Sequence, residues 1–310
     1  MAILVAADFD AAEWAAWWPA LQAALPDETL LREAGACAGA IDIALVANPP
    51  AGSLDGLPAL ALVQSLWAGV DRLLADASVP AAVPLARMVD PGMSALMAQT
   101  ALWAVLNLHR GFFDYAAQQR AGCWQQHLPR RADEVHVVVL GLGQMGRTAA
   151  QRLAANGYRV SGWASRTAAL DGVAVRAGAD ALAALLAEAQ IVINLLPLTD
   201  ATRGLFDART LARLAPGASL VNLARGAHVV DADLLAALDS GRLRHAVLDV
   251  FHTEPLPAGH RYWSHPAVTL LPHVAAPTDP RSAARIAAAN VAALRAGRAP
   301  AHLVDRARGY

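Results

Sequence analysis

The segment VHVVVLGLGQMGRTAAQRLAANG, residues 135–157, constrains the fold more than any other part of the sequence. An apolar run that predicts a buried strand leads directly into a G-x-G-x-x-G pattern, and helical periodicity follows it. Glycines at these positions permit a tight turn, a close approach of a pyrophosphate, and close packing of helix on strand. The segment therefore predicts a Rossmann-type unit that binds a dinucleotide. Its phosphates would lie at the start of the helix, on the N–H groups of Gln144 and Met145.

Apolar runs alternate with helical stretches on both sides of this fingerprint. The runs after it are continuously hydrophobic, which is typical of parallel strands that helices cover on both faces. Residues 93 to about 119 have helical periodicity over a length that could bridge two domains, and a helix from Arg281 onward could return to the first part of the chain. The apolar runs expected to form strands are residues 1–7, 41–47, 59–66, 84–89, 135–140, 158–163, 191–196, 219–224, 245–250 and 268–273.

A chain of 310 residues has room for two domains, and its composition, 56% hydrophobic and 16% charged, is that of a well-buried globular protein. We predict the α/β class, with two Rossmann-like, doubly wound parallel-sheet domains and an active-site cleft between them. Residues 1–98 and 277–310 would form a flavodoxin-like substrate domain. Residues 99–276 would form the dinucleotide-binding domain.

The residues after the fingerprint favour one nicotinamide cofactor over the other. For NAD, an acidic residue about twenty positions on should bind the ribose hydroxyls, but no carboxylate occurs between Arg147 and Leu170. The second predicted strand is followed instead by Ser165, Arg166 and Thr167, and a guanidinium with two hydroxyls suits a 2′-phosphate. We therefore expect NADPH to be preferred, with NADH possible. The alternative is that Arg166 only caps a solvent-facing turn.

Three chemically active residues follow three of the predicted strands. Arg225 follows SLVNLA, Glu254 follows HAVLDV after a short loop, and His273 closes VTLLPH. Ligands of open α/β sheets bind at the carboxyl ends of the strands, so these side chains are expected to meet there. Arg could hold a carboxylate and polarise the neighbouring carbonyl, while an imidazolium beside a Glu donates a proton. The trio indicates reduction of a 2-keto acid, whereas an isolated histidine would more often be structural.

Several kinds of chemistry are excluded by what the chain lacks. All 25 basic residues are arginines, so mechanisms that need a lysine, including that of the β-hydroxyacid dehydrogenases, cannot apply. A net charge of −1 gives no electrostatic footprint for nucleic acid or a membrane, and the charge-free run Pro91–Leu108 is expected to be a buried helix. Two cysteines, Cys37 and Cys123, are too few for a disulfide framework, which favours the cytoplasm. The histidines near Glu254 lack the spacing of known metal motifs, so no metal is expected.

With these residues in place, the sequence resembles the D-isomer-specific 2-hydroxyacid dehydrogenases, and within them the NADPH-dependent glyoxylate/hydroxypyruvate reductase branch. The resemblance covers nearly the whole chain and is densest in VNLARGAHVVDADLLAALDSGRLRHAVLDVFHTEPLP, LPHVAAPT and VDRARGY. It implies that Arg225 anchors the substrate, Glu254 partners the imidazole, and His273 is the acid-base catalyst. It further implies a homodimer acting on small 2-keto acids, with His273 as proton donor.

The resemblance also extends the predicted binding sites. Backbone amides of the loop at Ala68, Gly69 and Val70 would bind the substrate carboxylate, together with Arg225 and His273. The residues expected to bind the cofactor are Gly141, Gly143, Gln144, Met145, Gly146, Ser165, Arg166, Thr167, Pro197, Ala224 and Asp249.

Two departures from the branch leave alternatives open. Trp67 stands where a small residue is common, and Ala47 stands where a bulkier one is expected, so a larger 2-keto acid could be the substrate. Relatives on the same fold also include non-enzymatic transcriptional corepressors, so a dinucleotide-sensing regulator is the rival function.

Overall fold

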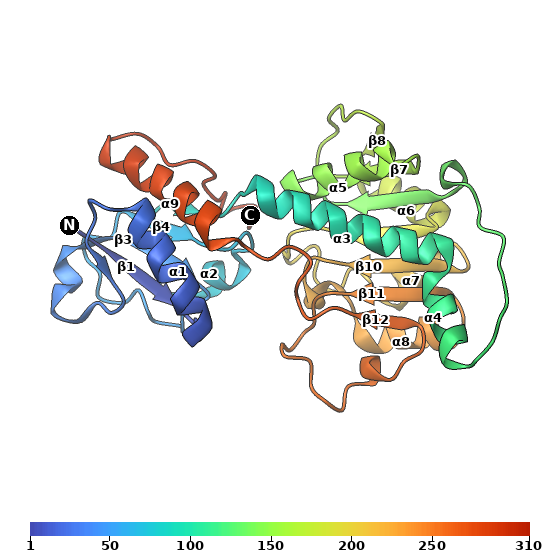
Figure 1. Cartoon of the computed structure of the whole chain (residues 1–310). Coiled ribbons are helices and arrows are strands. Elements are labelled where there is room, and N and C mark those ends of the chain that lie inside the picture. Colours follow the sequence, from blue (N-terminus) through green and yellow to red (C-terminus); the bar gives the residue numbers. More distant parts are fainter. The chain divides into compact units, whose positions relative to one another are not determined.

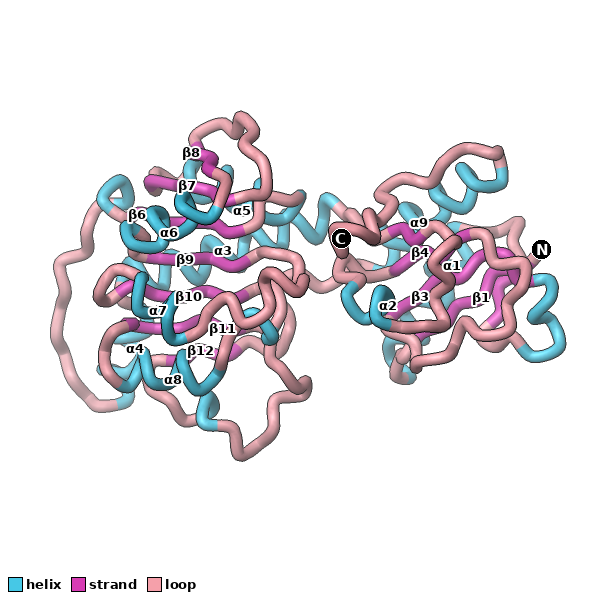
Figure 2. The backbone as a smooth tube through the Cα atoms, turned by 180° about the vertical axis from the view of Figure 1, so that it is seen from behind, coloured by secondary structure: helices cyan, strands magenta, loops and turns pink.

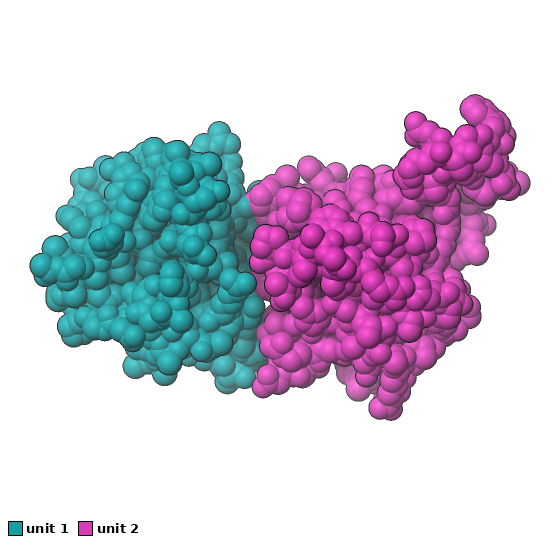
Figure 3. Space-filling model, turned by 90° about the horizontal axis from the view of Figure 1, so that it is seen from below, with its two compact units in different colours: residues 1–93, 278–310 teal, residues 94–277 magenta.

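The computed structural model describes all 310 residues, which divide into two compact units (Figure 3). Unit 1 contains Met1–Met93 and Thr278–Tyr310, and unit 2 contains Ser94–Pro277. Each unit is an α/β structure built on one parallel sheet, as the sequence predicts. The assignment of substrate and cofactor binding to separate parts of the chain remains a proposal.

Unit 1 has a five-stranded parallel sheet in the order β2-β1-β3-β4-β5. Its strands and helices are β1 (Ala2–Ala7), α1 (Ala11–Ala24), β2 (Leu30–Leu31), β3 (Ile41–Ala47), β4 (Leu62–Ser65), α2 (Asp71–Ala75), β5 (Leu85–Ala86) and α9 (Pro280–Arg295). Helix α9 packs on α1, so the last helix of the sequence completes the unit that the first strand begins (Figure 1). A buried hydrogen bond of 2.6 Å from Asn290 Nδ2 of α9 to Gln64 Oε1 of β4 fixes this return.

Unit 2 has a seven-stranded parallel sheet in the order β12-β11-β10-β9-β6-β7-β8. The chain runs from β6 outward to β8 and then continues on the other side from β9 to β12, so the topological switch point lies between β6 and β9. Its elements are α3 (Pro91–Arg110, which begins in unit 1), α4 (Phe112–Arg120), β6 (His136–Leu140), α5 (Gln144–Ala155), β7 (Arg159–Trp163), β8 (Val173–Arg176), α6 (Ala179–Glu188), β9 (Ile191–Asn194), α7 (Ala208–Arg213), β10 (Ala218–Asn222), α8 (Asp231–Asp239), β11 (Leu243–Leu248) and β12 (Val268–Leu270).

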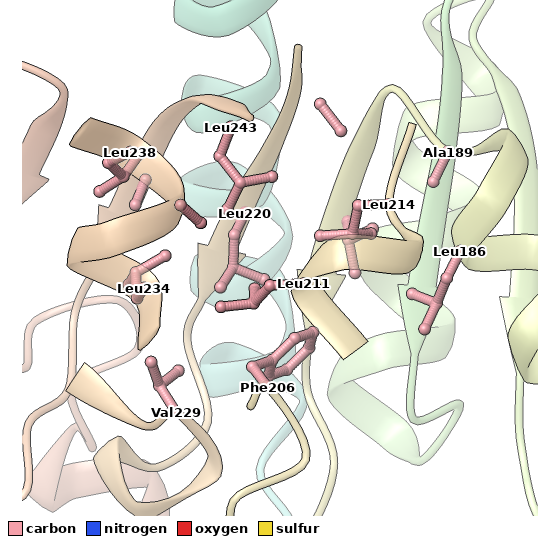
Figure 4. Packing of buried hydrophobic residues seen from close by; sticks show 14 of the residues in the cluster. Leu186, Ala189, Phe206, Leu211, Leu214, Leu220, Val229, Leu234, Leu238 and Leu243 are labelled. Carbon is pink, nitrogen blue, oxygen red and sulfur yellow. The ribbon is translucent and has the colours of Figure 1, made fainter. Parts of the chain in front are cut away.

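Helices cover both faces of the seven-stranded sheet, which explains why its central strands are largely apolar. Helices α3 and α5 pack on one face, and α6, α7 and α8 pack on the other (Figures 1 and 2). Figure 4 shows the apolar cluster between the sheet and helices α6, α7 and α8, in which Phe206, Leu211 and Leu220 are at most 1% exposed. The sheet is therefore a rigid platform for the loops at its carboxyl edge.

The structure corrects one predicted element and adds two strands. The single helix expected over residues 93–119 is broken into α3 and α4, because Gly111 between them adopts a left-handed φ of 69°. Strands β2 and β8 were not predicted; both are short and lie at sheet edges, and β8 alternates between half-buried and exposed residues. No helix of the structure, α3 included, combines the length and hydropathy that a membrane span requires.

Candidate active site

Three neighbouring strands of unit 2 end at one edge of the sheet, and the three predicted chemical residues follow them. Strand β11 pairs with β10 on one side and β12 on the other, all in parallel register, so the loops after them are adjacent. His273 Nδ1 lies 2.7 Å from Glu254 Oε2. The positive charge of Arg225 also acts on the Glu254 carboxylate. The fold thus brings together side chains that are far apart in the sequence.

His273 is held firmly while its reactive nitrogen stays accessible. Its backbone has a left-handed φ of 54°, a conformation that costs a non-glycine residue about 1 kcal/mol. The backbone N–H of His273 donates to the carbonyl of Asp249 at 2.9 Å, which helps to maintain that conformation. The imidazole is 52% exposed and is fixed through Nδ1, whereas Nε2 has no partner in the chain. Nε2 is therefore the atom that could exchange a proton with a substrate.

The Glu254 carboxylate fixes the orientation of that imidazole. Its Oε1 accepts a hydrogen bond of 2.9 Å from the Phe251 N–H, and Oε2 faces His273. Burial raises the pKa of Glu254, but the hydrogen bonds from His273 and Phe251, with the charges of His273 and Arg225, outweigh burial and leave the pKa below its ordinary value. An ionised Glu254 accepts from Nδ1–H, so the proton on Nδ1 is set by its partner.

Asp249 organises the turn that carries His273. The residue is 1% exposed, and its carboxylate accepts from the N–H of Val274 at 2.7 Å and from that of Ala275 at 3.1 Å. Burial raises the pKa of this carboxyl group, although the two amides and the charge of His273 act in the opposite direction. The predicted role of Asp249 in cofactor binding stays a prediction, because its carboxylate is occupied by the turn after β12.

Arg225 lies half-buried on a loop that only glycine can complete. Its guanidinium Nη1 donates to the Ala224 carbonyl at 2.7 Å. A Cβ atom on Gly226 would lie 2.0 Å from the carbonyl carbon of Phe251, so the absence of a side chain lets the Arg225 loop rest on the loop that leads to Glu254. Gly226 was not among the predicted site residues.

A buried amide pair also escaped the sequence analysis. Asn194 Nδ2 donates to Asn222 Oδ1 at 3.0 Å, and both residues are 0% exposed. Asn222 Nδ2 then donates to the Arg225 carbonyl at 2.9 Å, which ties the loop after β10 to the end of β9. A polar residue that ends an apolar strand at the ligand-binding edge, as in IVIN and SLVN, was the available signal.

The glycine fingerprint has the geometry that a dinucleotide requires. A Cβ atom on Gly146 would lie 1.8 Å from the Gly141 carbonyl oxygen, so this glycine permits the close contact of α5 with the turn. A Cβ atom on Gly143 would meet nothing within 4 Å, which leaves space for an approaching phosphate. No side chain caps the start of α5 at Gln144, where Gln144 is exposed and Met145 half-buried. These features fit a pyrophosphate on the helix N-terminus.

The remaining predicted cofactor residues occupy the ends of the neighbouring strands. Ser165, Arg166 and Thr167 are exposed after β7, and Arg166 has no hydrogen bond or ion pair within the chain. Pro197 follows β9 and is half-buried, and Ala224 follows β10 and is 8% exposed. The structure contains no group of three or more His, Cys, Asp or Glu side chains arranged to hold a metal.

In unit 1, the predicted anion-binding loop follows β4. The N–H groups of Ala68, Gly69 and Val70 donate to no acceptor within the chain. The preceding Trp67 is fixed by its carbonyl, which accepts from Met88 N at 3.1 Å and from Ser65 Oγ at 2.9 Å. Its ring packs edge-on against Trp17 and Phe9, with centroid distances of 5.4 and 6.0 Å. Trp67 thus belongs to an aromatic cluster at the carboxyl end of this sheet.

Comparison with known proteins identifies the family of this chain. The model of the NAD-binding domain of D-isomer-specific 2-hydroxyacid dehydrogenases matches residues 102–275. The chain belongs to this family. Glyoxylate/hydroxypyruvate reductase A of Serratia proteamaculans, another member, is 45% identical over 274 residues, which cover 87% of this chain and 88% of that protein.

Two solved structures of family members cover almost the full length of the chain. A 2-hydroxyacid dehydrogenase from Xanthobacter autotrophicus Py2, in complex with NADPH and MES, has a TM-score of 0.94 and 41% identity, covering 100% of this chain and 99% of that one. The NADPH-dependent glyoxylate/hydroxypyruvate reductase from Sinorhizobium meliloti, in complex with NADP and sulfate, has a TM-score of 0.93 and 32% identity, covering 99% of each chain.

Proposed function

We propose that this 2-hydroxyacid dehydrogenase reduces small 2-keto acids, glyoxylate and hydroxypyruvate, to the corresponding 2-hydroxy acids with NADPH. The pairing of His273 Nδ1 with Glu254 Oε2 at 2.7 Å, on the same edge as Arg225, is the observation that carries the proposal. The Serratia proteamaculans relative and the Sinorhizobium meliloti structure bear the name glyoxylate/hydroxypyruvate reductase, and the latter is complexed with NADP. The Xanthobacter autotrophicus 2-hydroxyacid dehydrogenase is complexed with NADPH.

The side chains divide the chemistry between them. NADPH, when bound, supplies the hydride that reduces the carbonyl carbon. The Arg225 guanidinium binds the substrate carboxylate through paired hydrogen bonds and draws electron density from the adjacent carbonyl. His273 Nε2 gives its proton to the carbonyl oxygen, and the ionised Glu254 stabilises the imidazolium until that transfer takes place.

Cofactor and substrate would be held largely by backbone groups. The N–H groups at the start of α5 suit a pyrophosphate, and Arg166, with Ser165 and Thr167, suits the 2′-phosphate that distinguishes NADPH from NADH. In unit 1, the unused N–H groups of Ala68, Gly69 and Val70 suit a carboxylate.

Turnover of NADPH with 2-keto acids, followed by nicotinamide absorbance, tests this function. We expect oxidation of NADPH with glyoxylate and hydroxypyruvate, slower rates with NADH, and lower kcat/KM with longer or aromatic 2-keto acids. Loss of turnover in a His273→Gln variant that still binds NADPH would support the proton-donor role. Tight NADPH binding by the unaltered protein without turnover of any 2-keto acid would favour the regulator instead. A preference for bulky substrates would mean that Trp67 shapes a different pocket.

We also propose that two copies of the chain form a homodimer through unit 2 and that the protein works in the cytoplasm. The segment after α4 is a long loop (Figure 1). Residues 121–131 are all exposed, and Trp124 and Leu128 are 92% and 100% exposed. Such apolar side chains on one extended segment favour a protein partner, and a second copy is the simplest one. Cys37 and Cys123 are both exposed and unpaired, which suits a reducing compartment.

A further inference from the structure

The imidazole of His228 lies between two backbone carbonyl groups beside the candidate active site. His228 ends a 3-10 helix, Gly226–His228, and is 0% exposed. Its Nδ1 is 3.1 Å from the carbonyl oxygen of Arg225, and its Nε2 is 3.2 Å from that of Pro197. These two residues follow the neighbouring strands β10 and β9.

The two partners indicate the protonation state of this ring. A carbonyl oxygen only accepts hydrogen bonds, and a neutral imidazole has one N–H and one lone pair. In the neutral form, one of the two contacts would bring a lone pair against a carbonyl oxygen, which is unfavourable in a buried site. When both nitrogens carry hydrogen, both contacts become charge-assisted hydrogen bonds.

Another buried histidine of unit 2, His136 of β6, shows the contrast. His136 Nδ1 is 3.3 Å from the Glu188 carbonyl, but its Nε2 is 2.8 Å from the Ser161 hydroxyl. A hydroxyl can donate as well as accept, so a neutral His136 satisfies both contacts. Burial accordingly lowers the pKa of His136. The surroundings of His228 differ, because the Arg225 and Pro197 oxygens that its two ring nitrogens face are both backbone carbonyl groups.

We propose that His228 is a doubly protonated positioning residue, which sets the spacing between the substrate-anchoring loop at Arg225 and the cofactor-side loop at Pro197. Each of the two carbonyl groups also has a partner near it in the sequence: Asn222 Nδ2 donates to the Arg225 carbonyl at 2.9 Å, and Thr202 Oγ1 donates to the Pro197 carbonyl at 2.8 Å. Backbone hydrogen bonds join the two loops further along, from Gly204 to Ala227 and from Phe206 to His228. The His228 ring joins them at Arg225 and Pro197 themselves. The consequence for catalysis rests on the proposed function, but the protonation state and the link between the loops do not.

Nitrogen NMR of the histidine side chains tests the protonation state without turnover. The experiment uses the whole protein with ¹⁵N-labelled histidine at pH 7.5, and the His228 signal is the one missing from the spectrum of a His228→Gln variant. We expect both ring nitrogens of His228 to resonate as protonated. A resonance typical of a nitrogen with a free lone pair would overturn the proposal.

Kinetics of graded variants tests the link between the loops. His228→Gln retains one donor group and His228→Leu retains none, so kcat/KM for glyoxylate should fall in that order, by about 10- to 100-fold in the Leu variant. His245→Leu is the matched control, since it also removes a buried imidazole from unit 2. His245 lies within β11, before the strand reaches the carboxyl edge. This control should lower stability and leave kcat/KM within about twofold.

The outcomes separate this inference from the proposed function. If His228→Leu has the same melting temperature as the His245→Leu control and keeps the kcat/KM of the unaltered protein, the positioning role is contradicted. If His228→Leu does not fold, the NMR result on the unaltered protein decides the matter. If the unaltered protein reduces no 2-keto acid, the proposed function fails. The NMR result would still test the protonation state of His228. A weaker NADPH affinity of His228→Gln than of the unaltered protein would still support the link between the loops, and an equal affinity would contradict it.

Discussion

His273 combines an exposed ring with a fixed orientation. The imidazole is 52% exposed, so its reactive nitrogen can meet a ligand, while Glu254 and the backbone contact with Asp249 prevent rotation of the ring and the chain. The ring has two nitrogens with different tasks: Nδ1 is used for orientation, and Nε2 is left for chemistry. Replacement of Glu254, whose side chain contacts Nδ1, should therefore affect catalysis without removing the catalytic group.

Replacing Glu254 with Gln removes the charge and keeps the shape. Because hydrogen bonds and neighbouring charges hold the pKa of Glu254 below its ordinary value, the carboxylate persists as pH falls to that ordinary value, and its stabilising contribution is lost only below it. Throughout the neutral range the variant thus lacks a charge that the unaltered protein has. We expect kcat/KM at pH 7.5 to fall about 100-fold, and the alkaline limb of the pH profile to move to lower pH. A Glu188→Gln control, on an exposed residue at the end of α6, should change neither; an unchanged profile in Glu254→Gln would contradict this role.

Charge reversal at Arg166 should change the choice of cofactor. Its guanidinium is exposed and has no partner within the chain, so it is available to a 2′-phosphate, and an aspartate there would repel that phosphate. We expect the ratio of kcat/KM for NADPH to kcat/KM for NADH to fall about 10- to 100-fold in Arg166→Asp. The matched control is Arg213→Asp, on an exposed arginine at the end of α7. Equal ratios in the two variants would show that Arg166 only faces solvent.

At the scale of elements, two glycines at the turn between β6 and α5 have different tasks: Gly146 is needed for folding, and Gly143 for binding. Gly146→Ala would place a methyl group 1.8 Å from a backbone oxygen, so we expect it to destabilise unit 2 by at least about 3 kcal/mol. Gly143 has a φ of −66° and open space around it, so Gly143→Ala should melt within about 2 °C of the unaltered protein. The added methyl should nevertheless raise the Kd for NADPH about tenfold or more, because it occupies space that the phosphates need. Unchanged NADPH affinity in Gly143→Ala, measured by fluorescence titration, would contradict the binding role.

Strand β11 contains a buried histidine that should make the protein sensitive to acid. Burial lowers the pKa of His245 from 6.5 to about 4, while its ring stacks on Phe113 at 4.6 Å and Nε2 contacts Thr269 Oγ1 at 2.8 Å. A depressed histidine pKa means that the unfolded chain takes up a proton first, so stability is lost as pH falls from 6.5 to about 4. The loss amounts to about 3 kcal/mol. In His245→Gln, the free energy of unfolding, measured with urea, should therefore fall by correspondingly less between pH 7 and pH 4.5. An equal difference in both proteins would show that other groups cause the acid sensitivity.

The same elements show what a sequence can and cannot reveal. Continuous apolar runs predicted every central strand of the larger sheet, since helices cover both faces. Strand β8 was missed because it lies at the edge, where alternate residues meet solvent. The helical pattern continues across Gly111, so periodicity alone could not show that α3 ends there.

The candidate site was predictable to the extent that it depends on strand order. Arg225, Glu254 and His273 follow strands whose parallel arrangement could be inferred, and the structure places Glu254 against His273. His228 and Gly226 were not identified, because their importance arises from the Pro197 and Phe251 backbones, which only the folded chain brings close.

For the molecule as a whole, the segment after α4 provides the test of assembly. Replacing Trp124 and Leu128 together by Ser removes two almost fully exposed apolar side chains, so it should leave each unit folded and convert a dimer to a monomer in sedimentation at micromolar concentration. Trp263→Ser is the matched control, because Trp263 is also exposed, at 57%, but lies outside that segment. A monomeric unaltered protein, or a double variant that remains dimeric, would contradict the proposed interface.

The division of the chain also sets the order in which it can fold during synthesis. Unit 2 is one uninterrupted segment, whereas unit 1 needs α9, which the ribosome makes after all of unit 2. Unit 1 therefore stays incomplete while the seven-stranded sheet forms, and the surface that α9 will cover is still exposed to solvent. A released chain truncated before Pro280 should already protect unit 2 from protease, whereas its amino-terminal strands should become resistant only in the full chain, which contains α9.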